Sequence, residues 1–76
     1  MAHYFFHILD GLWHVHDDEG MQLSGLAVAR AEALRSLDDL IMAARREQRA
    51  VGTFAIEMTD EDGNVIGVCR RFVPAN

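Results

Sequence analysis

The sequence is poor in the features that mark secreted, membrane-spanning or nucleic-acid-binding proteins. It has one cysteine, Cys69, so the chain cannot close an internal disulfide, and a reducing, cytoplasmic setting is expected. No apolar run approaches the roughly 18 residues of a membrane span, and no basic leader precedes an apolar segment at the N-terminus. Lysine is absent, and the formal net charge of −5 argues against general affinity for nucleic acid or an anionic membrane.

Catalytic motifs are also scarce. No serine or cysteine has a spacing that pairs it with a base, and there is no glycine-rich phosphate loop. The run that starts at Asp60 is similar to the opening of a calcium loop, but the twelfth position, where such a loop has a bidentate glutamate, is Arg71. We therefore expect a protein that is not an enzyme, that has no cofactor, and that uses this run as a turn.

What the sequence does contain is one long helical pattern between short strand patterns. A chain of 76 residues, half of them apolar, has room for a single domain, with an ordered core expected over about 3–72. The helix is expected from Leu26 to about Arg49, with Ser24 as its N-cap and residues 21–23 as the linker that leads to it. Its apolar stripe, wide enough to cover one face of a small sheet, comprises Leu26, Ala33, Leu34, Leu37, Leu40, Ile41 and Ala44.

A hairpin is predicted before the helix. Residues 3–9 and 12–16 alternate in polarity, and Asp10-Gly11 between them is the strongest short signal for a two-residue turn. The resulting register sets His7 opposite His14 and brings Trp13 and Val15 to the core face.

A second hairpin is predicted after the helix. Residues 53–59 alternate, and the turn 60–63 returns the chain so that Met58 faces Ile66. The whole pattern predicts an α+β fold, ββαββ, in which one helix packs on one face of a four-stranded antiparallel sheet with strand order 2-1-3-4.

Three histidines are the candidate metal ligands. In the predicted register His7 and His14 are cross-strand neighbours about 5 Å apart at Cβ, and His16 follows on the same face. Three imidazoles at that spacing could hold Zn²⁺ or Ni²⁺, although histidines exposed on a hairpin often bind nothing. A metal-binding or metal-sensing protein is therefore one alternative.

The sheet face away from the helix is the predicted interaction surface. An uncovered sheet face with a large apolar area usually meets another protein surface, and a homodimer is the economical expectation. The plain alternative is a monomer with scattered exposed apolar side chains. The predicted interface residues are Phe5, Leu9, Leu12, Ala55, Val65 and Cys69.

The predicted connectivity also separates the charges, with acidic turns at one end of the molecule and arginines at the other. Complementarity to the helix dipole, together with solvated turns, accounts for such a placement. Alternatively, the arginine end binds an anionic partner or the acidic end of a neighbouring copy. The acidic residues are Asp17, Asp18, Glu19, Asp60, Glu61 and Asp62, and the arginines are Arg45, Arg46, Arg49, Arg70 and Arg71.

Several short motifs lie along nearly the whole chain. They are the opening Tyr4-Phe5-Phe6-His7, Asp10-Gly11, Asp17-x-x-Gly20, Leu23, Ala29-Arg30-x-Glu32-Ala33 and Ile56-Glu57-x-Thr59-Asp60-x-x-Gly63-x-Val65. Together they resemble a family of short, uncharacterised alphaproteobacterial proteins. That family is a domain of unknown function, so the resemblance implies no activity, cofactor or partner. Of the candidate metal ligands, only His7 belongs to these motifs.

A weaker similarity is to antitoxin domains of the HicB type, which also place strands before a helix rich in glutamate and alanine. The chain lacks the Pro- and Gly-rich segment that precedes the helix in those domains, and an attached DNA-binding element. Three functions are therefore open. The first is a small non-enzymatic interaction or regulatory module that self-associates, the second is the metal-binding protein, and the third is an antitoxin-like regulator that binds a partner protein.

Overall fold

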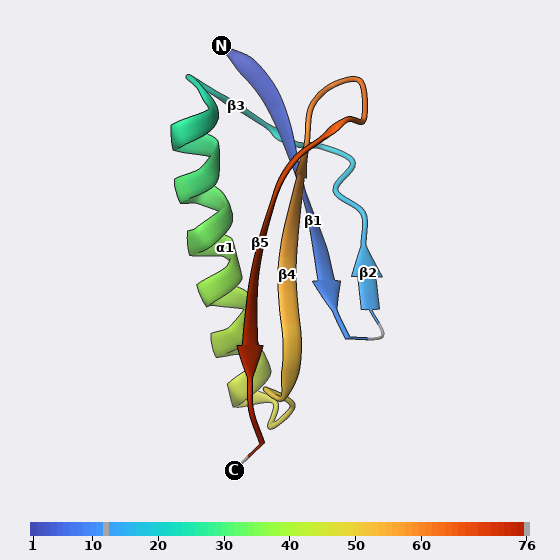
Figure 1. Cartoon of the computed structure of the whole chain (residues 1–76), viewed down its shortest axis with the longest axis vertical. Helices are drawn as coiled ribbons and strands as arrows, with labels where there is room; N and C mark the ends of the chain where they lie inside the picture. Colours follow the sequence, from blue (N-terminus) through green and yellow to red (C-terminus); the bar gives the residue numbers. More distant parts are fainter. Residues whose placement is uncertain (12, 76) are drawn as a thin grey trace.

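The structure, a computed structural model, describes residues 1–11 and 13–75. One helix lies along an antiparallel sheet (Figure 1), so the prediction of an α+β fold of this kind is confirmed. The elements, in chain order, are β1 (Ala2–Asp10), β2 (Trp13–Val15), β3 (Met21–Leu23), α1 (Leu26–Arg46), β4 (Gly52–Thr59) and β5 (Val65–Val73).

The sheet has five strands, so the prediction of four is wrong. The segment Met21–Leu23, expected to be a linker, forms β3 and pairs antiparallel with the start of β1, where Tyr4 lies opposite Met21. The strand order is β2-β1-β4-β5, with β3 paired to β1 in addition. Three residues between two loops are too few for a recognisable alternation, which is why the sequence does not reveal β3.

The first hairpin turns one residue later than predicted. Asp10 remains in β1 and pairs with Trp13, so Gly11, at a φ of +55°, belongs to the connection instead of sharing the turn with Asp10. His14 therefore lies opposite Leu9, and the predicted pairing of His7 with His14 is wrong. Side chains keep their predicted faces, because the register has moved by an even number of residues.

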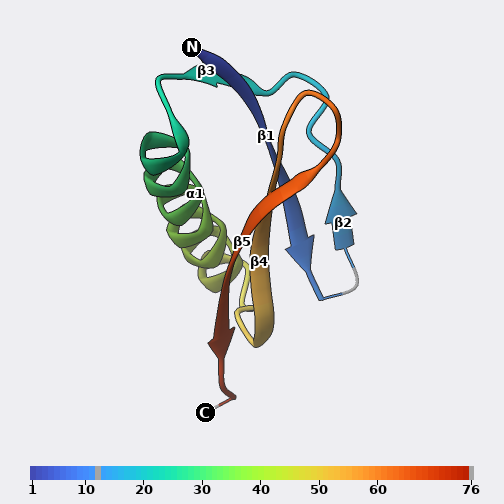
Figure 2. The same cartoon turned by 45° about the horizontal axis from the view of Figure 1, so that its top comes forward.

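The edge strand β2 is not covered by the helix. Trp13 and Val15 are 70% and 51% exposed, although both were expected in the core. The helix packs against β4, β5 and β3, and in two views it lies on the opposite side of the molecule from β2 (Figures 1 and 2). The apolar side of β2 is therefore left open.

The second hairpin has the predicted turn but a different register. The N–H of Gly63 donates to the carbonyl of Asp60 at 3.1 Å, which closes the turn. Met58 then pairs with Gly67 instead of Ile66, because the pairing shifts by one residue between Met58 and Thr59. A one-residue shift turns every following side chain to the other face. Cys69, expected on the outer face, is consequently in the core at 8% exposure.

The helix is shorter than predicted, and fewer of its side chains are buried. It ends at Arg46, and its N-cap is Gly25, which makes no side-chain cap hydrogen bond, so the assignment of Ser24 is wrong. Leu26 and Leu34 are 53% and 45% exposed. The buried helix residues are Ala29, Ala33, Leu37, Ile41 and Ala44.

The core lies between this helix face and the sheet. Three alanines in the buried face let the helix approach the sheet closely, and the large side chains come mostly from the strands. Its other members are Tyr4, Phe54, Ile56, Met58 and Cys69. In the part of the chain that the structure describes, no helix is long and apolar enough to span a membrane.

Candidate functional site

His7 is buried on β1 at 4% exposure, and both its ring nitrogens are engaged. Nδ1 accepts the backbone N–H of Asp17 at 3.0 Å, and Nε2 lies 2.9 Å from the hydroxyl oxygen of Thr59. Because Nδ1 is an acceptor, the ring proton resides on Nε2 and is donated to Thr59. In this state His7 can neither take a proton from Thr59 nor offer a free nitrogen to a metal.

Of the other two candidate ligands, only His16 lies beside His7. The structure brings His16 to His7, with the rings stacked and their centroids 4.4 Å apart. His14 lies opposite Leu9 instead of His7. Across residues 1–11 and 13–75, no group of three or more His, Cys, Asp or Glu side chains is arranged to hold a metal ion. The cross-strand pair on which the metal hypothesis depended is therefore not formed.

Asp17 ties the loop between β2 and β3 to β1. Its carboxylate accepts the N–H of Phe6 at 3.0 Å, and those of Glu19 and Gly20 at 3.1 and 3.0 Å. Partial burial would by itself raise the pKa of Asp17, but the hydrogen bonds from Phe6, Gly20 and Glu19 outweigh it and lower the pKa below its ordinary value. The motif Asp17-x-x-Gly20 therefore has a structural role.

Gly20 completes this loop for a steric reason. Its φ is +67°, and a Cβ built there would lie 2.6 Å from Nε2 of His3 and 2.7 Å from the carbonyl oxygen of Tyr4. No side chain fits between the loop and the start of β1, so the sequence needs glycine at this position.

The predicted interface residues are only partly brought together. Phe5 and Leu9 are half-buried on the outer face of β1, and Val65 is 57% exposed. Ala55 is on the same face but buried, Cys69 is in the core, and Leu12 lies outside the described residues. Two apolar residues of this face were missed because of the register of β5. They are Val68, opposite Glu57, and Phe72, opposite Thr53, and Phe72 is 67% exposed.

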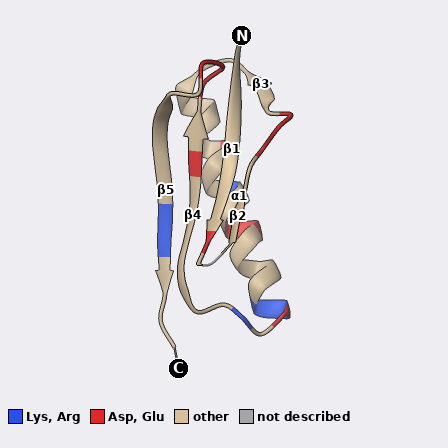
Figure 3. Ribbon diagram, turned by 90° about the vertical axis from the view of Figure 1, so that its right-hand side faces the viewer, with Lys and Arg blue, Asp and Glu red and all other residues tan. Residues whose placement is uncertain are grey.

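The five predicted arginines occupy the half of the molecule away from the acidic loops (Figure 3). Arg49 is outside the helix and forms ion pairs with Asp10 and Glu47, and Arg71 pairs with Asp38 on α1. Within the described chain, the other predicted members, Arg45, Arg46 and Arg70, are exposed and form no ion pair.

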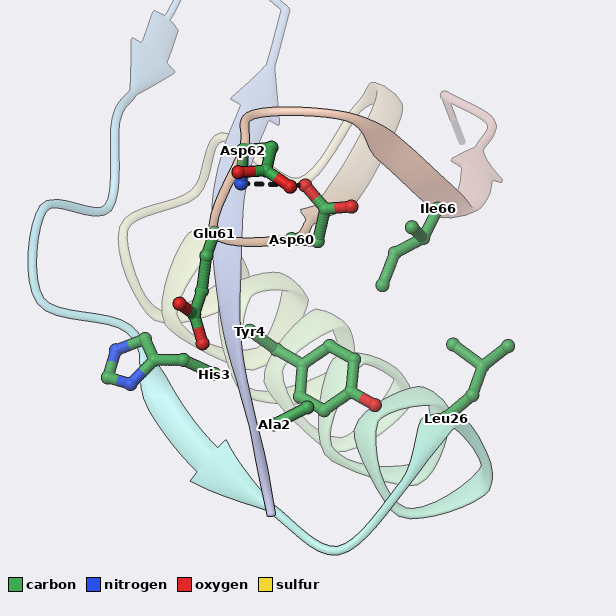
Figure 4. Close-up of a pocket in the computed structure, with 8 residues that line it drawn as sticks. All are labelled: Ala2, His3, Tyr4, Leu26, Asp60, Glu61, Asp62 and Ile66. Atoms are coloured by element: carbon green, nitrogen blue, oxygen red, sulfur yellow. Dashed lines mark hydrogen bonds between the residues drawn. The ribbon is translucent and has the colours of Figure 1, made fainter.

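A cavity of about 430 Å³ opens at the acidic end, between the start of β1, the start of α1 and the turn after β4 (Figure 4). Its floor is apolar, and acidic residues of the turn line its rim. The floor comprises Ala2, Tyr4, Leu26 and Ile66, the rim comprises Asp60, Glu61 and Asp62, and His3 lies at one side.

The carboxylates of the rim differ in their surroundings. The carboxylate of Asp60 accepts hydrogen bonds from the backbone N–H groups of Asn64 and Asp62, at 2.9 Å each. These bonds lower the pKa of Asp60, and the bond from Asn64 has the largest effect. In the described chain, the carboxylates of Glu61 and Asp62 have no hydrogen-bond or ion-pair partner. The sequence identified this run only as a turn, because the residues that it meets come from β1 and α1.

These features define a small α+β domain with one helix on an antiparallel sheet and a cavity at its acidic end. The chain belongs to the family described as a domain of unknown function (DUF6894), which matches residues 3–72. The resemblance to an uncharacterised domain family is thereby confirmed. No curated protein and no solved structure matches the chain.

Proposed function

We propose that this protein is a small non-enzymatic interaction module that self-associates through the sheet face away from α1. The observation that carries the proposal is the one-sided cover of the sheet. On the opposite face the loop after β2 covers His7, and no helix or strand of the described chain packs on the remainder (Figures 1 and 2). Apolar side chains on that face are Phe5, Leu9, Val65, Val68 and Phe72.

A second copy is the partner that the charges of this face favour. Glu57 pairs with Val68 and Arg70 pairs with Ala55, so the two charged residues are diagonal neighbours on adjacent strands. Neither forms an ion pair with another described residue. A two-fold axis midway between them sets Glu57 of each copy over Arg70 of the other, and the apolar side chains around them then stack between sheets about 10 Å apart.

The buried polar groups support a non-enzymatic role. His7 donates to Thr59 and accepts from the backbone of Asp17, so its proton is fixed on the side that a general base would need free. Cys69, the one cysteine, is a buried free thiol, which supports a cytoplasmic location as part of the proposal.

Sedimentation velocity tests the dimer with a matched pair of variants. Phe72→Glu places a charge in the proposed interface, and Met42→Glu places the same charge at a 55% exposed position of α1. At concentrations up to about 0.5 mM, wild type and Met42→Glu are expected to sediment as dimers and Phe72→Glu as a monomer. Wild type that remains monomeric over this range refutes the proposal.

Charge reversal tests the geometry of the dimer. Glu57→Arg and Arg70→Glu each bring like charges together across the two-fold axis, so each is expected to weaken association by tenfold or more. The double variant E57R/R70E restores opposite charges and is expected to restore the dimer. A double variant that associates no better than either single variant contradicts this arrangement.

The two alternative functions have less structural support and remain separately testable. Metal analysis of protein purified without a His tag would favour metal binding if it found stoichiometric Zn²⁺ or Ni²⁺ that is lost in His14→Ala. Co-purification of a small basic ribonuclease would favour the antitoxin-like regulator.

A further inference from the structure

The outer edge of β5 is the longest unpaired strand edge of the described chain. β5 has nine residues and pairs with β4 on one side only, so the backbone N–H and C=O groups along its other side have no backbone partner. Figure 3 shows β5 at the border of the sheet. The one proline of the chain, Pro74, follows the strand and does not interrupt it. An extended segment of another chain can add to such an edge as a further strand.

The side of α1 next to this edge is positively charged. Arg71 of β5 is ion-paired with Asp38, which places this side of α1 beside β5. Leu34 and Arg45 lie one turn before and two turns after Asp38 on the same side of the helix, and both are exposed. Arg30 lies one turn before Leu34. In the described chain Arg30 and Arg45 form no ion pair.

These three arginines, Arg30, Arg45 and Arg71, are the arginine flank. They are accompanied by one aspartate, Asp38, in a protein whose formal net charge is −5. The flank is therefore positive where the chain as a whole is negative, and it favours an anionic segment at the edge of β5.

A second copy of the chain does not fit this edge, because β5 contains two arginines and no acidic residue. An antiparallel pairing over the whole strand sets Val65 opposite Val73 of the other copy, so Arg70 faces Val68. The two Arg70 side chains are then diagonal neighbours and repel one another. The edge is thus protected against pairing with itself but open to an acidic strand.

The two sides of an added strand would meet different surfaces. Side chains alternate along a strand, so every second one would lie on the α1 side and the others on the outer sheet face. On the α1 side they would approach the arginine flank, and a cavity of about 540 Å³, lined by Arg45 and Val73 among others, leaves room for them at the end of β5. On the outer face they would extend the apolar row of Val68 and Phe72. The edge therefore favours a segment in which acidic and apolar residues alternate.

We infer that β5 binds an extended segment of a partner protein in which acidic and apolar residues alternate. The segment would hydrogen-bond to the backbone of β5, direct its carboxylates at the arginine flank and place its apolar side chains beside Val68 and Phe72. Stacking two sheets face to face leaves their edges open, so this site and the proposed dimer can coexist.

Fluorescence anisotropy with a labelled eight-residue peptide tests the charge of the segment. The peptide alternates valine and glutamate, and it is expected to bind with a Kd on the order of 100 µM. The same peptide with glutamine in place of glutamate keeps the alternation and loses the charge, so it should bind at least tenfold more weakly. Single-stranded oligothymidine is anionic but has no peptide backbone, and it should bind more weakly than the glutamate peptide.

N-methylation tests whether the peptide adds as a strand. Along a strand, the backbone N–H groups of alternate residues point to opposite edges. Two methylated peptides are therefore compared, one methylated at its valines and one at its glutamates. One of them, and not the other, is expected to lose binding by tenfold or more, because only one edge of the peptide faces β5.

Matched variants test the arginine flank. Arg45→Gln removes a charge from the flank and is expected to weaken binding of the glutamate peptide severalfold. Arg46→Gln removes the same charge from the next residue, which is also exposed but lies about 100° further around the helix, and it should change binding less than twofold. Glu57→Arg disrupts the proposed dimer and leaves the edge of β5 intact, so it should still bind the peptide.

Four results would overturn the inference. They are equal affinity for the glutamate and glutamine peptides, binding of both methylated peptides as tightly as the parent peptide, equal losses in Arg45→Gln and Arg46→Gln, and tighter binding of oligothymidine than of the peptide. The peptide titration of Glu57→Arg keeps this site distinguishable from the dimer, because it measures the edge of β5 in a chain that does not self-associate.

Discussion

Asp17 shows how much of the fold can depend on one side chain of a loop. The N–H of Phe6 and two N–H groups of its own loop all donate to this carboxylate, and its backbone N–H donates to His7. The sequence indicated a turn at Asp17-x-x-Gly20, since both residue types favour turns. It did not indicate that the Asp17 carboxylate would accept a hydrogen bond from β1. That bond joins residues eleven positions apart and depends on how the loop folds back.

Replacing Asp17 by Ala is expected to lower the free energy of unfolding by about 1–2 kcal/mol at pH 7. Hydrogen bonds to a charged group can contribute more than this, but Asp17 is only partly buried, and solvent weakens them. The folded-state pKa of Asp17 lies below the unfolded value, so its contribution is present above about pH 4 and is lost as the pH falls further. Urea unfolding at pH 7 and pH 3 measures both effects.

Asp18→Ala is the matched control, because the Asp18 side chain is 87% exposed. It is expected to change stability by less than about 0.5 kcal/mol at either pH. A cost for Asp17→Ala that equals the control, or that persists in full at pH 3, would show that the hydrogen bonds of Asp17 contribute nothing specific.

At the scale of the elements, the helix was the most predictable part and its start the least. The apolar spacing located α1 and most of its buried face, because a period of 3.6 over many residues is a strong signal. Ser24 is a better capping residue than Gly25 by type, but the chain enters the helix at Gly25 in an extended conformation, with a φ of 172°. Cap choice depends on that entry path, which the helical period does not encode.

The start of α1 has no side-chain cap, so substitutions at Ser24 and Gly25 can show which of these residues is the N-cap. Gly25→Asp adds a capping carboxylate where φ is compatible with any residue and where a Cβ meets nothing within 4 Å. We expect a gain of about 0.5–1 kcal/mol, or several degrees in Tm, from the cap and from the reduced entropy of the unfolded chain. Thermal unfolding by circular dichroism measures it.

Ser24→Ala should leave Tm within about 2 °C of wild type, because the Ser24 hydroxyl caps nothing. A large loss of stability in Ser24→Ala, with no gain in Gly25→Asp, would instead identify Ser24 as the functional cap.

The strand pairings show that the sequence predicts that a hairpin forms but not its exact register. Asp10-Gly11 marked a turn correctly, but Asp10 stays in β1, where its carboxylate is ion-paired with Arg49 from beyond the helix. In the second hairpin the shift between Met58 and Thr59 moved Cys69 inward and Phe72 outward. One error is a turn displaced by one residue and the other is a one-residue shift in strand pairing, and each changes which side chains lie opposite one another.

For the whole molecule, polarity pattern was sufficient for the fold class and for the separation of charge, but not for the cavity. The acidic loops follow β2 and β4, which run in the same direction, whereas the five predicted arginines lie in the other half of the molecule, in the last turn of α1, just after it and within β5 (Figure 3). The cavity forms where β1, α1 and the turn after β4 lie near one another but leave a space between their side chains. That is a property of packing, which alternation and turn signals do not describe.

The proposed dimer predicts a thermal stability that depends on protein concentration. If folding and association are coupled, each tenfold rise in concentration adds about 1.4 kcal/mol to the stability of the dimer. With an unfolding entropy of about 2.1 cal/mol/K per residue over two chains of 76 residues, Tm should rise by about 4 °C per decade.

Differential scanning calorimetry between about 10 µM and 1 mM measures this slope. Met42→Glu, with its charge on the outer side of α1, should keep it, whereas Phe72→Glu should unfold at one temperature throughout. A flat Tm for the wild type would mean that the sheet face remains exposed to solvent in the folded protein. The apolar side chains of β5 would then need a different partner, because an edge strand that ends in an exposed Phe72 is prone to pairing with other chains.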